Sequence, residues 1–238
     1  MTTPGLGTIL GVWAHPDDET YLTAGLMARA VREGDRVACI TATRGEEGSW
    51  DEDRWPSARM GEIREAELIR SLEILGVREH YWLEYPDGTL ADVSDQEGAA
   101  KISTIMKGVE PTSVLTFGPD GMTGHPDHKA ISRWAARAFR SSAPLGARLY
   151  HAVYTPEWVE RFARRFAAFN VFMEEGTPPV VPADRLTINF ELPEDILDLK
   201  LAAIEEHNSQ VEGMFRAFGT DVFREGGRAE FFVQAATK

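Results

Sequence analysis

Short apolar segments alternate with longer amphipathic segments along most of the chain. The apolar segments have the length of β-strands, and the segments between them repeat apolar residues at helical spacing. In the first of these, Leu22, Leu26 and Ala30 recur every four residues, and Gly34 follows where a helix C-terminus is expected. The predicted strands are 8–13, 36–43, 80–84, 113–117, 148–154 and 185–190, and the predicted helices are 22–33, 57–75, 95–109, 128–139 and 194–207. This alternation predicts an α/β fold with a mostly parallel sheet and helices on both faces.

One segment, between about residues 156 and 184, departs from this pattern. An Arg- and Phe-rich helix is predicted from Glu157 to Phe172, and the turn-forming sequence GTPP follows at 176–179. We interpret this segment as a lid-like excursion from a single domain that spans residues 1–238. No internal repeat or low-complexity linker divides the chain.

The composition restricts the class of protein. The chain has 238 residues, 43% of them hydrophobic, and 25 basic against 38 acidic side chains give a net charge of −13. This charge argues against binding to nucleic acid or to an anionic membrane. The single cysteine, Cys39, excludes a disulfide within the chain, and neither a signal peptide nor a long apolar run occurs. We therefore expect a soluble, cytoplasmic protein with no nucleic-acid or membrane partner, whose self-association the sequence leaves open.

Two short clusters of histidine and aspartate follow predicted strands. The sequence AHPDDE at 14–19 comes after the strand 8–13, and GHPDH at 124–128 comes after the strand 113–117. Open α/β folds bind their ligands at the carboxyl ends of parallel strands. Two loops of imidazole and carboxylate groups at one sheet edge are suited to hold a metal ion and a hydrolytic water.

A catalytic zinc site uses three protein ligands and leaves one position for water. His15, one of the neighbouring carboxylates and His128 would supply such a set. Because adjacent side chains in a loop point apart, one of Asp17 and Asp18 can bind the ion while the other faces the open position and accepts a proton from water. Zinc suits these donors, and Fe²⁺, Co²⁺ or Mn²⁺ are alternatives because sites of this kind select weakly.

The second cluster contains two further candidates. His125, if protonated, can stabilise an oxyanion or donate a proton to a leaving amine. Asp127 lies between His125 and His128 in the sequence and can orient one of them. His80 and His151 have no such neighbours, and we interpret both as structural.

Two other features have both a structural and a functional interpretation. Arg64 lies four residues from Met60 and from Leu68 in the predicted helix 57–75, so its charge interrupts an apolar row. It forms either a buried ion pair or a contact with a polar substrate. Trp50 and Trp55 stand in a polar loop, where they either pack normally or stack on a sugar ring.

Together these motifs resemble the PIG-L/LmbE-like family of N-acetylglucosamine deacetylases and related amide hydrolases. The clusters at 14–19 and 124–128 carry the resemblance, and weaker matches lie at 43–46, 63–68 and 207–210. The resemblance implies a zinc-dependent hydrolase with a Rossmann-like fold and its metal site at the C-terminal ends of the strands.

The resemblance also implies a role for each candidate. The metal ligands would be His15, Asp18 and His128. Asp17 would be the general base, His125 would stabilise the oxyanion or act as the acid, and Arg64 would hold the substrate. One departure is Thr123, because some members of the family have a tyrosine at that position. Carbonyl polarisation would then depend on the metal and His125, or on a group from another loop.

The leading hypothesis is hydrolysis of an N-acyl group, and the substrate we expect is the N-acetyl group of an N-acetylglucosamine-type sugar. A close alternative is hydrolysis of another amide, as by a thiol-conjugate amidase or a tailoring deacetylase, at the same site. From a different class, the chain would be a sugar- or nucleotide-binding α/β module without catalysis. No GxGxxG sequence follows the first strand, which argues against a dinucleotide-binding version of that module.

Overall fold

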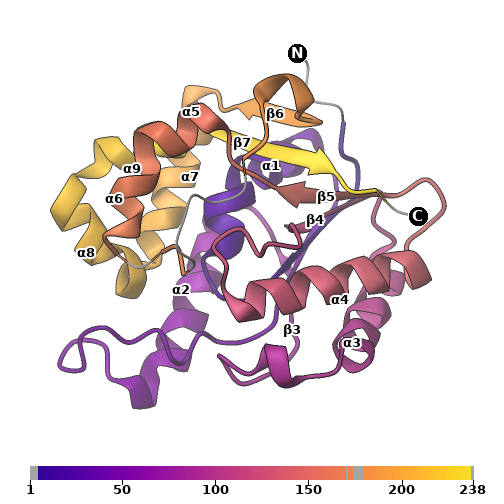
Figure 1. Ribbon diagram of the computed structural model, residues 1–238, viewed down its shortest axis with the longest axis horizontal. Coiled ribbons are helices and arrows are strands. Elements are labelled where there is room, and N and C mark those ends of the chain that lie inside the picture. The colour runs from indigo at the N-terminus through magenta and orange to yellow at the C-terminus, as the bar shows by residue number, and fades with distance from the viewer. Residues whose placement is uncertain (1–4, 170, 174–179, 237–238) are drawn as a thin grey trace.

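The computed structural model describes residues 5–169, 171–173 and 180–236, and within them a seven-stranded sheet forms the centre of the molecule (Figure 1). The strands are β1 (Ile9–Trp13), β2 (Val37–Thr41), β3 (Glu79–Trp82), β4 (Ser113–Phe117), β5 (Arg148–Ala152), β6 (Ile188–Glu191) and β7 (Ala229–Gln234). Their order is β3-β2-β1-β4-β5-β7-β6. The first five are parallel, and β7 is antiparallel to both of its neighbours. The mostly parallel α/β sheet that the sequence predicted is confirmed.

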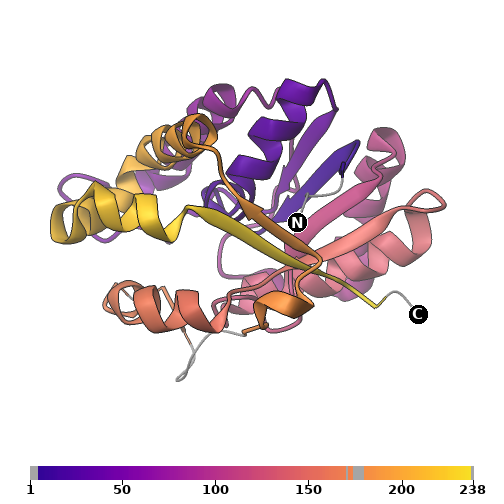
Figure 2. The same cartoon turned by 90° about the horizontal axis from the view of Figure 1, so that it is seen from above.

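Helices cover both faces of the sheet (Figure 2). The longer helices are α1 (Asp18–Glu33), α2 (Met60–Leu75), α3 (Asp95–Val109), α4 (Pro126–Ser142), α7 (Glu194–Glu206) and α8 (Asn208–Phe218). Helix α7 packs against α1 and α2 on one face, and α3 packs against α4 on the other. Strands β1, β2 and β4 are buried along their whole length, as expected for parallel strands with helices on both faces.

Several boundaries differ from the predicted ones for local reasons. Helix α1 begins at Asp18 rather than at residue 22, because Asp18 and Glu19 are acidic residues in the first turn, where the helix dipole favours negative charge. Helix α4 begins at Pro126, a residue whose fixed φ suits the first position of a helix. Helices α8 and α9 (Thr220–Gly226) and strand β7 form a C-terminal unit that the hydrophobic pattern did not predict.

The excursion after β5 is helical over residues 156–167. It consists of α5 (Pro156–Trp158), a π-helical turn (Val159–Ala163) and α6 (Arg164–Ala167). Its aromatic side chains pack against α7, α8 and α9 in a second apolar cluster, separate from the main core, which we call the aromatic cluster. The buried members of the aromatic cluster are Phe162, Phe166, Ile204, Val211, Met214 and Phe223. The predicted turn at 176–179 lies outside the described residues.

No helix in the described part of the chain combines the length and the apolar character needed to span a membrane.

Candidate active site

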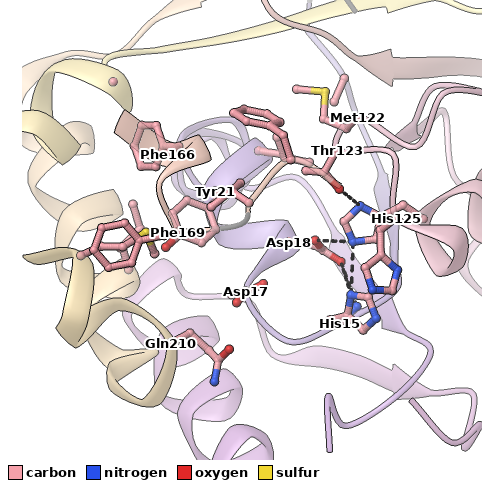
Figure 3. Close-up of a pocket in the computed structure, with 18 of the residues that line it drawn as sticks. His15, Asp17, Asp18, Tyr21, Met122, Thr123, His125, Phe166, Phe169 and Gln210 are labelled. Carbon is pink, nitrogen blue, oxygen red and sulfur yellow. Dashed lines mark hydrogen bonds and ion pairs between the residues drawn. The ribbon is translucent and has the colours of Figure 1, made fainter. Parts of the chain in front are cut away.

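The two histidine clusters meet at the point where the strand order of the sheet reverses. The chain passes from β1 through α1 to β2 on one side, and from β4 through α4 to β5 on the other. Because the loops after β1 and β4 diverge, a crevice opens between them at the carboxyl ends of these neighbouring strands. His15 lies in the first loop, and His125 and His128 lie at the start of α4 (Figure 3). Two segments more than 100 residues apart in the sequence thus form one site.

Donor atoms of three side chains from these segments form a compact triangle, to which Asp18 contributes both carboxylate oxygens. Nδ1 of His15 lies 3.2 Å from Nε2 of His128, which lies 3.4 Å from Oδ1 of Asp18. Oδ2 of Asp18 lies 3.8 Å from Nδ1 of His15. Tetrahedral zinc with ligands at 2.0–2.1 Å requires donor atoms about 3.3 Å apart. The donor chemistry and the spacing of these three buried side chains therefore fit a metal ion. Donor atoms of His15, His125 and His128, and of His15, Asp87 and Asp127, also lie within 4.8 Å of one another.

The other nitrogen of His15 is held by two carboxylates. Nε2 lies 3.0 Å from Oδ1 of Asp87 and 3.4 Å from Oδ2 of Asp127, which leaves Nδ1 for an ion. Asp127 also accepts the N–H groups of Gly88 and Leu90 at 2.9 and 3.1 Å. Burial opposes the charged imidazole, but hydrogen bonds to Asp127 and Asp87 raise the pKa of His15 to about 10. A bound ion would displace the proton from Nδ1, as metal binding generally does.

The position of Asp127 differs from the sequence-based expectation. Its carboxylate was expected to orient one of the histidines beside it in the sequence. In the fold it contacts His15, from the other cluster, and its own backbone N–H bonds to Nδ1 of His125 at 3.1 Å. A carboxylate behind a metal-binding imidazole fixes the orientation of the ring and increases its basicity.

His128 and Asp18 are held by the backbone. The Nδ1–H group of His128 donates to the carbonyl of Gly121 at 3.0 Å, which leaves Nε2 unprotonated, and Oγ1 of Thr123 lies 3.1 Å from the same nitrogen. Burial lowers the pKa of His128 well below its usual value, so the ring is neutral. The carboxylate of Asp18 accepts the N–H of His15 at 2.8 Å. Thr123, the position of the missing tyrosine, thus contacts a histidine of the triangle.

Asp17 precedes α1 with a φ of 108°, a conformation that is rare and strained for a residue other than glycine. This turn separates its carboxylate from that of Asp18, and Asp17 faces the open space in front of the triangle (Figure 3). Oδ2 of Asp17 lies 3.2 Å from Nη2 of Arg64. Burial raises the pKa of Asp17 to about 6, although the charge of Arg64 opposes this. A carboxylate with such a pKa is suited to exchange protons near neutral pH.

Arg64 is buried, with an exposed fraction of 5%, and reaches the site from α2. Besides its ion pair with Asp17, it donates to the carbonyls of Pro16 at 2.6 Å and Gly45 at 3.1 Å. A Cβ atom on Gly45 would overlap Nη1 of Arg64, and one on Gly48 would lie 2.6 Å from it. The glycines of this loop are therefore needed for the approach of the guanidinium. In this structure Arg64 therefore forms a buried ion pair, which was one of the two interpretations that the sequence allowed.

His125 is half-buried and caps α4. Its Nδ1 accepts the N–H of Asp127, so a neutral His125 ring carries its proton on Nε2. Burial and the neighbouring charge of His15 lower the pKa of His125, which favours this neutral form. The ring centroid lies 4.8 Å from that of His15 and 5.1 Å from that of His128. His125 is thus placed as a neutral hydrogen-bond donor beside the triangle, rather than as the cation considered from the sequence.

Sequence reasoning missed Asp87, whose carboxylate holds His15. Asp87 follows β3, a third parallel strand that ends at the same sheet edge, between Pro86 and Gly88. An acidic residue in a turn after a parallel strand was the available signal. His80 bonds to Thr41 at 2.9 Å, in agreement with a structural role.

The segment 207–210 anchors α8 to the rest of the site. The backbone N–H and the hydroxyl of Ser209 each donate to the carboxylate of Glu67 at 2.7 Å. Nε2 of His207 lies 3.5 Å from Glu19, which follows Asp18 in α1. These contacts support the loop-anchoring interpretation of this segment, although it begins α8 rather than only ending α7.

A cavity of about 790 Å³ opens in front of the triangle and extends to the aromatic cluster. The triangle, Asp17, Arg64 and Gln210 line one part of it, and aromatic side chains of α5, α6 and α9 line the other (Figure 3). Trp50 is 49% exposed at its rim, whereas Nε1 of Trp55 is buried away from solvent. The cavity is large enough for a sugar and a substituent.

The fold and the site together define an α/β protein with a histidine–aspartate metal-binding group at the switch point of a parallel sheet, a class that includes metal-dependent hydrolases. Residues 10–139, more than half of the chain, match the PIG-L family, described as GlcNAc-PI de-N-acetylase. The chain belongs to the PIG-L family.

Similar proteins extend this match beyond residue 139. A 1D-myo-inositol 2-acetamido-2-deoxy-alpha-D-glucopyranoside deacetylase of Kineococcus radiotolerans is 32% identical over 249 residues, which cover 85% of this chain and 68% of that protein. A second deacetylase of this name, from Catenulispora acidiphila, is 31% identical and covers 91% of this chain and 84% of its own length. The N,N'-diacetylchitobiose deacetylase of Pyrococcus horikoshii shares the fold, with a TM-score of 0.66 and 20% identity over 97% of this chain and 84% of that chain.

Proposed function

We propose that this protein is a metal-dependent hydrolase of linear amides that removes the N-acetyl group from an N-acetylglucosamine-type sugar or glycoconjugate. The observation that carries the proposal is the triangle of His15, Asp18 and His128 with the carboxylate of Asp17 in front of it. The names of the two curated relatives support the substrate class, because both describe deacetylases of an N-acetylated glucosamine joined to inositol.

His15, Asp18 and His128 would hold the ion. Two imidazoles and one carboxylate suit zinc, which we propose as the native metal, and Fe²⁺, Co²⁺ and Mn²⁺ are the alternatives. When bound, such an ion polarises the acyl carbonyl and makes water a better nucleophile near neutral pH. The carboxylates of Asp87 and Asp127 behind His15 support this assignment, because they direct Nδ1 to the site.

Asp17 would accept the proton of the attacking water. With a pKa of about 6, it is mostly ionised at pH 7 and can both take up and release a proton. Arg64 holds this carboxylate in position through the 3.2 Å ion pair, and because its side chain also lines the cavity, we propose that it contacts the substrate as well. Nε2–H of His125 would donate to the acyl oxygen as negative charge develops on it. As the C–N bond breaks, the amine takes the proton that Asp17 accepted.

We also propose that residues 1–238 form a single domain, in which the segment 156–184 acts as a lid-like excursion over the cavity. Its described residues support this, because Trp158, Phe166 and Phe169 line the cavity directly. This segment and the loop around Trp50 would then select the substrate, because both line the cavity apart from the proposed metal ligands.

The test is acetate release by metal-loaded protein from N-acetylglucosamine, its inositol glycoside and N,N'-diacetylchitobiose, compared with Asp17→Asn. We expect Asp17→Asn to lower kcat by about 10²–10⁴-fold, the usual contribution of a general base. Asp53→Asn, which changes an exposed carboxylate in the loop after β2, is the matched control and should keep full activity. Equal rates for the wild type and Asp17→Asn on every amide would contradict the proposed mechanism.

The alternatives give different results in the same experiment. Cleavage of a thiol-conjugate amide with no cleavage of sugar amides would indicate an amidase that uses the same site. Metal-free protein that binds N-acetyl sugars but hydrolyses no amide, and gains no thermal stability from zinc, would indicate a binding module.

A further inference from the structure

The part of the cavity farthest from the histidines has an apolar wall. It lies beyond Asp17 and is built by α5, α6, α8, α9 and residues just outside α5 and α6, and we call it the aromatic compartment (Figure 3). The side chains that form its wall are Tyr154, Trp158, Phe166, Phe169, Met214 and Phe223. In Figure 3, Phe166 and Phe169 lie across the cavity from His15 and His125. A group bound at the triangle can therefore extend directly into the aromatic compartment.

The wall is preformed by stacked rings. Tyr154 stacks on Trp158 with centroids 3.8 Å apart, Trp158 is parallel to Phe166 at 5.8 Å, and Phe166 meets Phe223 edge to face. Nε1 of Trp158 donates to the carbonyl of Gly226 at 2.8 Å, so the polar edge of this indole is satisfied within the protein. Rings fixed in this way offer contact area to a ligand at little cost in conformational entropy.

Charged groups at the base of the aromatic compartment are paired with each other. Nζ of Lys200 lies 2.8 Å from Oε1 of Glu230 and donates to the carbonyl of Tyr21 at 2.8 Å. Neither charge is therefore free to bind a polar ligand. The hydroxyl of Tyr21 is buried and has no hydrogen-bond partner within the described residues, so it can bond to one ligand oxygen. Strongly apolar walls with one free polar group are typical of sites for amphipathic ligands.

The rim of the compartment is also apolar. Trp50, Phe169 and Met173 are 49%, 39% and 58% exposed, and all three line the cavity, Trp50 from the loop after β2 and the other two from the excursion after β5. Single exposed apolar side chains are normal, but several around one opening mark a binding surface. Gly213 of α8 lies beside two of them, because a Cβ atom there would be in van der Waals contact with Phe169 at 3.5 Å and with Trp50 at 3.8 Å.

We propose that the natural substrate carries an apolar substituent, an aromatic ring or an alkyl chain, that binds in the aromatic compartment while its amide lies at the triangle. This inference rests on the proposed function and specifies its substrate class. A small polar glycoside would leave the compartment filled only with water. The apolar group belongs either to the acyl chain or to the aglycone, since both extend from the amide-bearing sugar.

Two substrate series distinguish these sources. In the first, methyl glucosaminide carries N-acetyl, N-butyryl or N-octanoyl groups; in the second, N-acetylglucosamine carries a methyl, benzyl or octyl aglycone. Each fully buried methylene strengthens binding about fourfold, so we expect kcat/KM to rise at least about tenfold along one series. The series that rises identifies the source. Flat kcat/KM values in both series, with the methyl N-acetyl compound hydrolysed, would overturn the inference while leaving the proposed function intact.

Substitutions at the rim test whether the aromatic compartment causes the preference for apolar substituents. Phe169→Ala and Trp50→Ala should each lower the ratio of kcat/KM for the octyl or octanoyl substrate to that for the methyl N-acetyl compound, by about fivefold or more. Leu145→Ala removes an equally apolar, fully exposed side chain before β5, at the opposite edge of the sheet, and should leave that ratio unchanged. Thermal melts show which variants are folded, and two rim variants allow for the loss of one. An unchanged ratio in a folded rim variant would contradict the assignment.

A binding measurement separates this inference from the proposed function. If no amide is hydrolysed, the proposed function fails, and calorimetric titration with octyl and methyl β-glucoside then decides the inference alone. We expect the octyl compound to bind at least about tenfold more tightly to the wild type, with this advantage reduced in Phe169→Ala. Equal binding of the two glucosides would overturn it.

Discussion

The ion pair between Lys200 and Glu230 joins three elements behind the active site. Lys200 in α7 is 1% exposed and Glu230 in β7 is 2% exposed, with 2.8 Å between Nζ and Oε1. Nζ also donates to the carbonyl of Tyr21 in α1. The Glu230 carboxylate accepts the N–H groups of Gly25 and Leu26 at 2.7 and 2.8 Å, within the same helix. The pair therefore fixes α1, whose first turn carries Asp18, to the C-terminal unit.

Lys200→Met keeps most of the side-chain volume but leaves the Glu230 carboxylate buried without a counterion. Removing one partner of a buried pair costs about 3–5 kcal/mol in the free energy of unfolding, because the remaining charge has no compensation. Adding Glu230→Gln removes that charge and retains a carbonyl acceptor for the backbone of α1. We expect the double variant to regain at least about 1 kcal/mol relative to Lys200→Met, and comparison with the single Glu230→Gln variant measures the coupling.

Urea unfolding followed by far-UV circular dichroism measures these differences. Lys107→Met, which changes an exposed lysine in the last turn of α3, is the control and should alter the unfolding free energy by less than about 0.5 kcal/mol. A cost of less than about 1 kcal/mol for Lys200→Met, or a double variant no more stable than Lys200→Met alone, would show that the buried ion pair does not stabilise the fold in this way.

Three further predictions concern the pH dependence, the base and the metal. Burial lowers the pKa of His80 to about 4, so the folded protein resists protonation of this ring. The free energy of unfolding should therefore fall by at most about 3 kcal/mol as the pH drops from 6.5 to 4. His80→Gln should reduce this loss, as measured by urea unfolding. Gly45→Ala places a Cβ against Arg64 at a φ of +67°, and should lower kcat for acetate release about tenfold or more. Asp87→Asn weakens the support of His15, and should reduce zinc affinity about 10–100-fold in a chelator competition.

Each of these has an outcome that contradicts it. An unchanged difference in stability between pH 7 and 4.5 in His80→Gln would mean that other groups cause the loss. Full activity of Gly45→Ala would show that Arg64 does not need its present position. Wild-type zinc affinity in Asp87→Asn, with Asp92→Asn as an exposed control, would remove Asp87 from the support of the ion.

The central sheet could be predicted because its signals are local. Strands β1, β2 and β4 are buried on both faces and therefore appear in the sequence as uninterrupted apolar runs. Once strands and helices alternate, parallel order follows, and the two histidine clusters must emerge at one sheet edge. The sequence misplaced the start of α1 by four residues, since the first turn is acidic and its apolar stripe begins only at Leu22.

The C-terminal unit could not be predicted in the same way. Strand β7 lies between β5 and β6 and pairs with both in antiparallel orientation, although β6 precedes it by about 40 residues. No local pattern specifies this insertion, because the pairing depends on backbone hydrogen bonds to distant strands. The aromatic cluster likewise joins residues of 162–166 to residues of 204–223, and each segment alone reads as an ordinary amphipathic helix.

By itself, the sequence determined the fold class, the edge of the sheet that carries the site, and the residue types available there. Only the tertiary structure decided that Asp127 and Asp87 support His15, that Arg64 pairs with Asp17, and that an apolar compartment faces the triangle. The physical reason is the range of the interactions. Hydrophobic periodicity and capping act between neighbours in the sequence, whereas the partner of a buried charge or ring is set by packing between segments far apart in the chain.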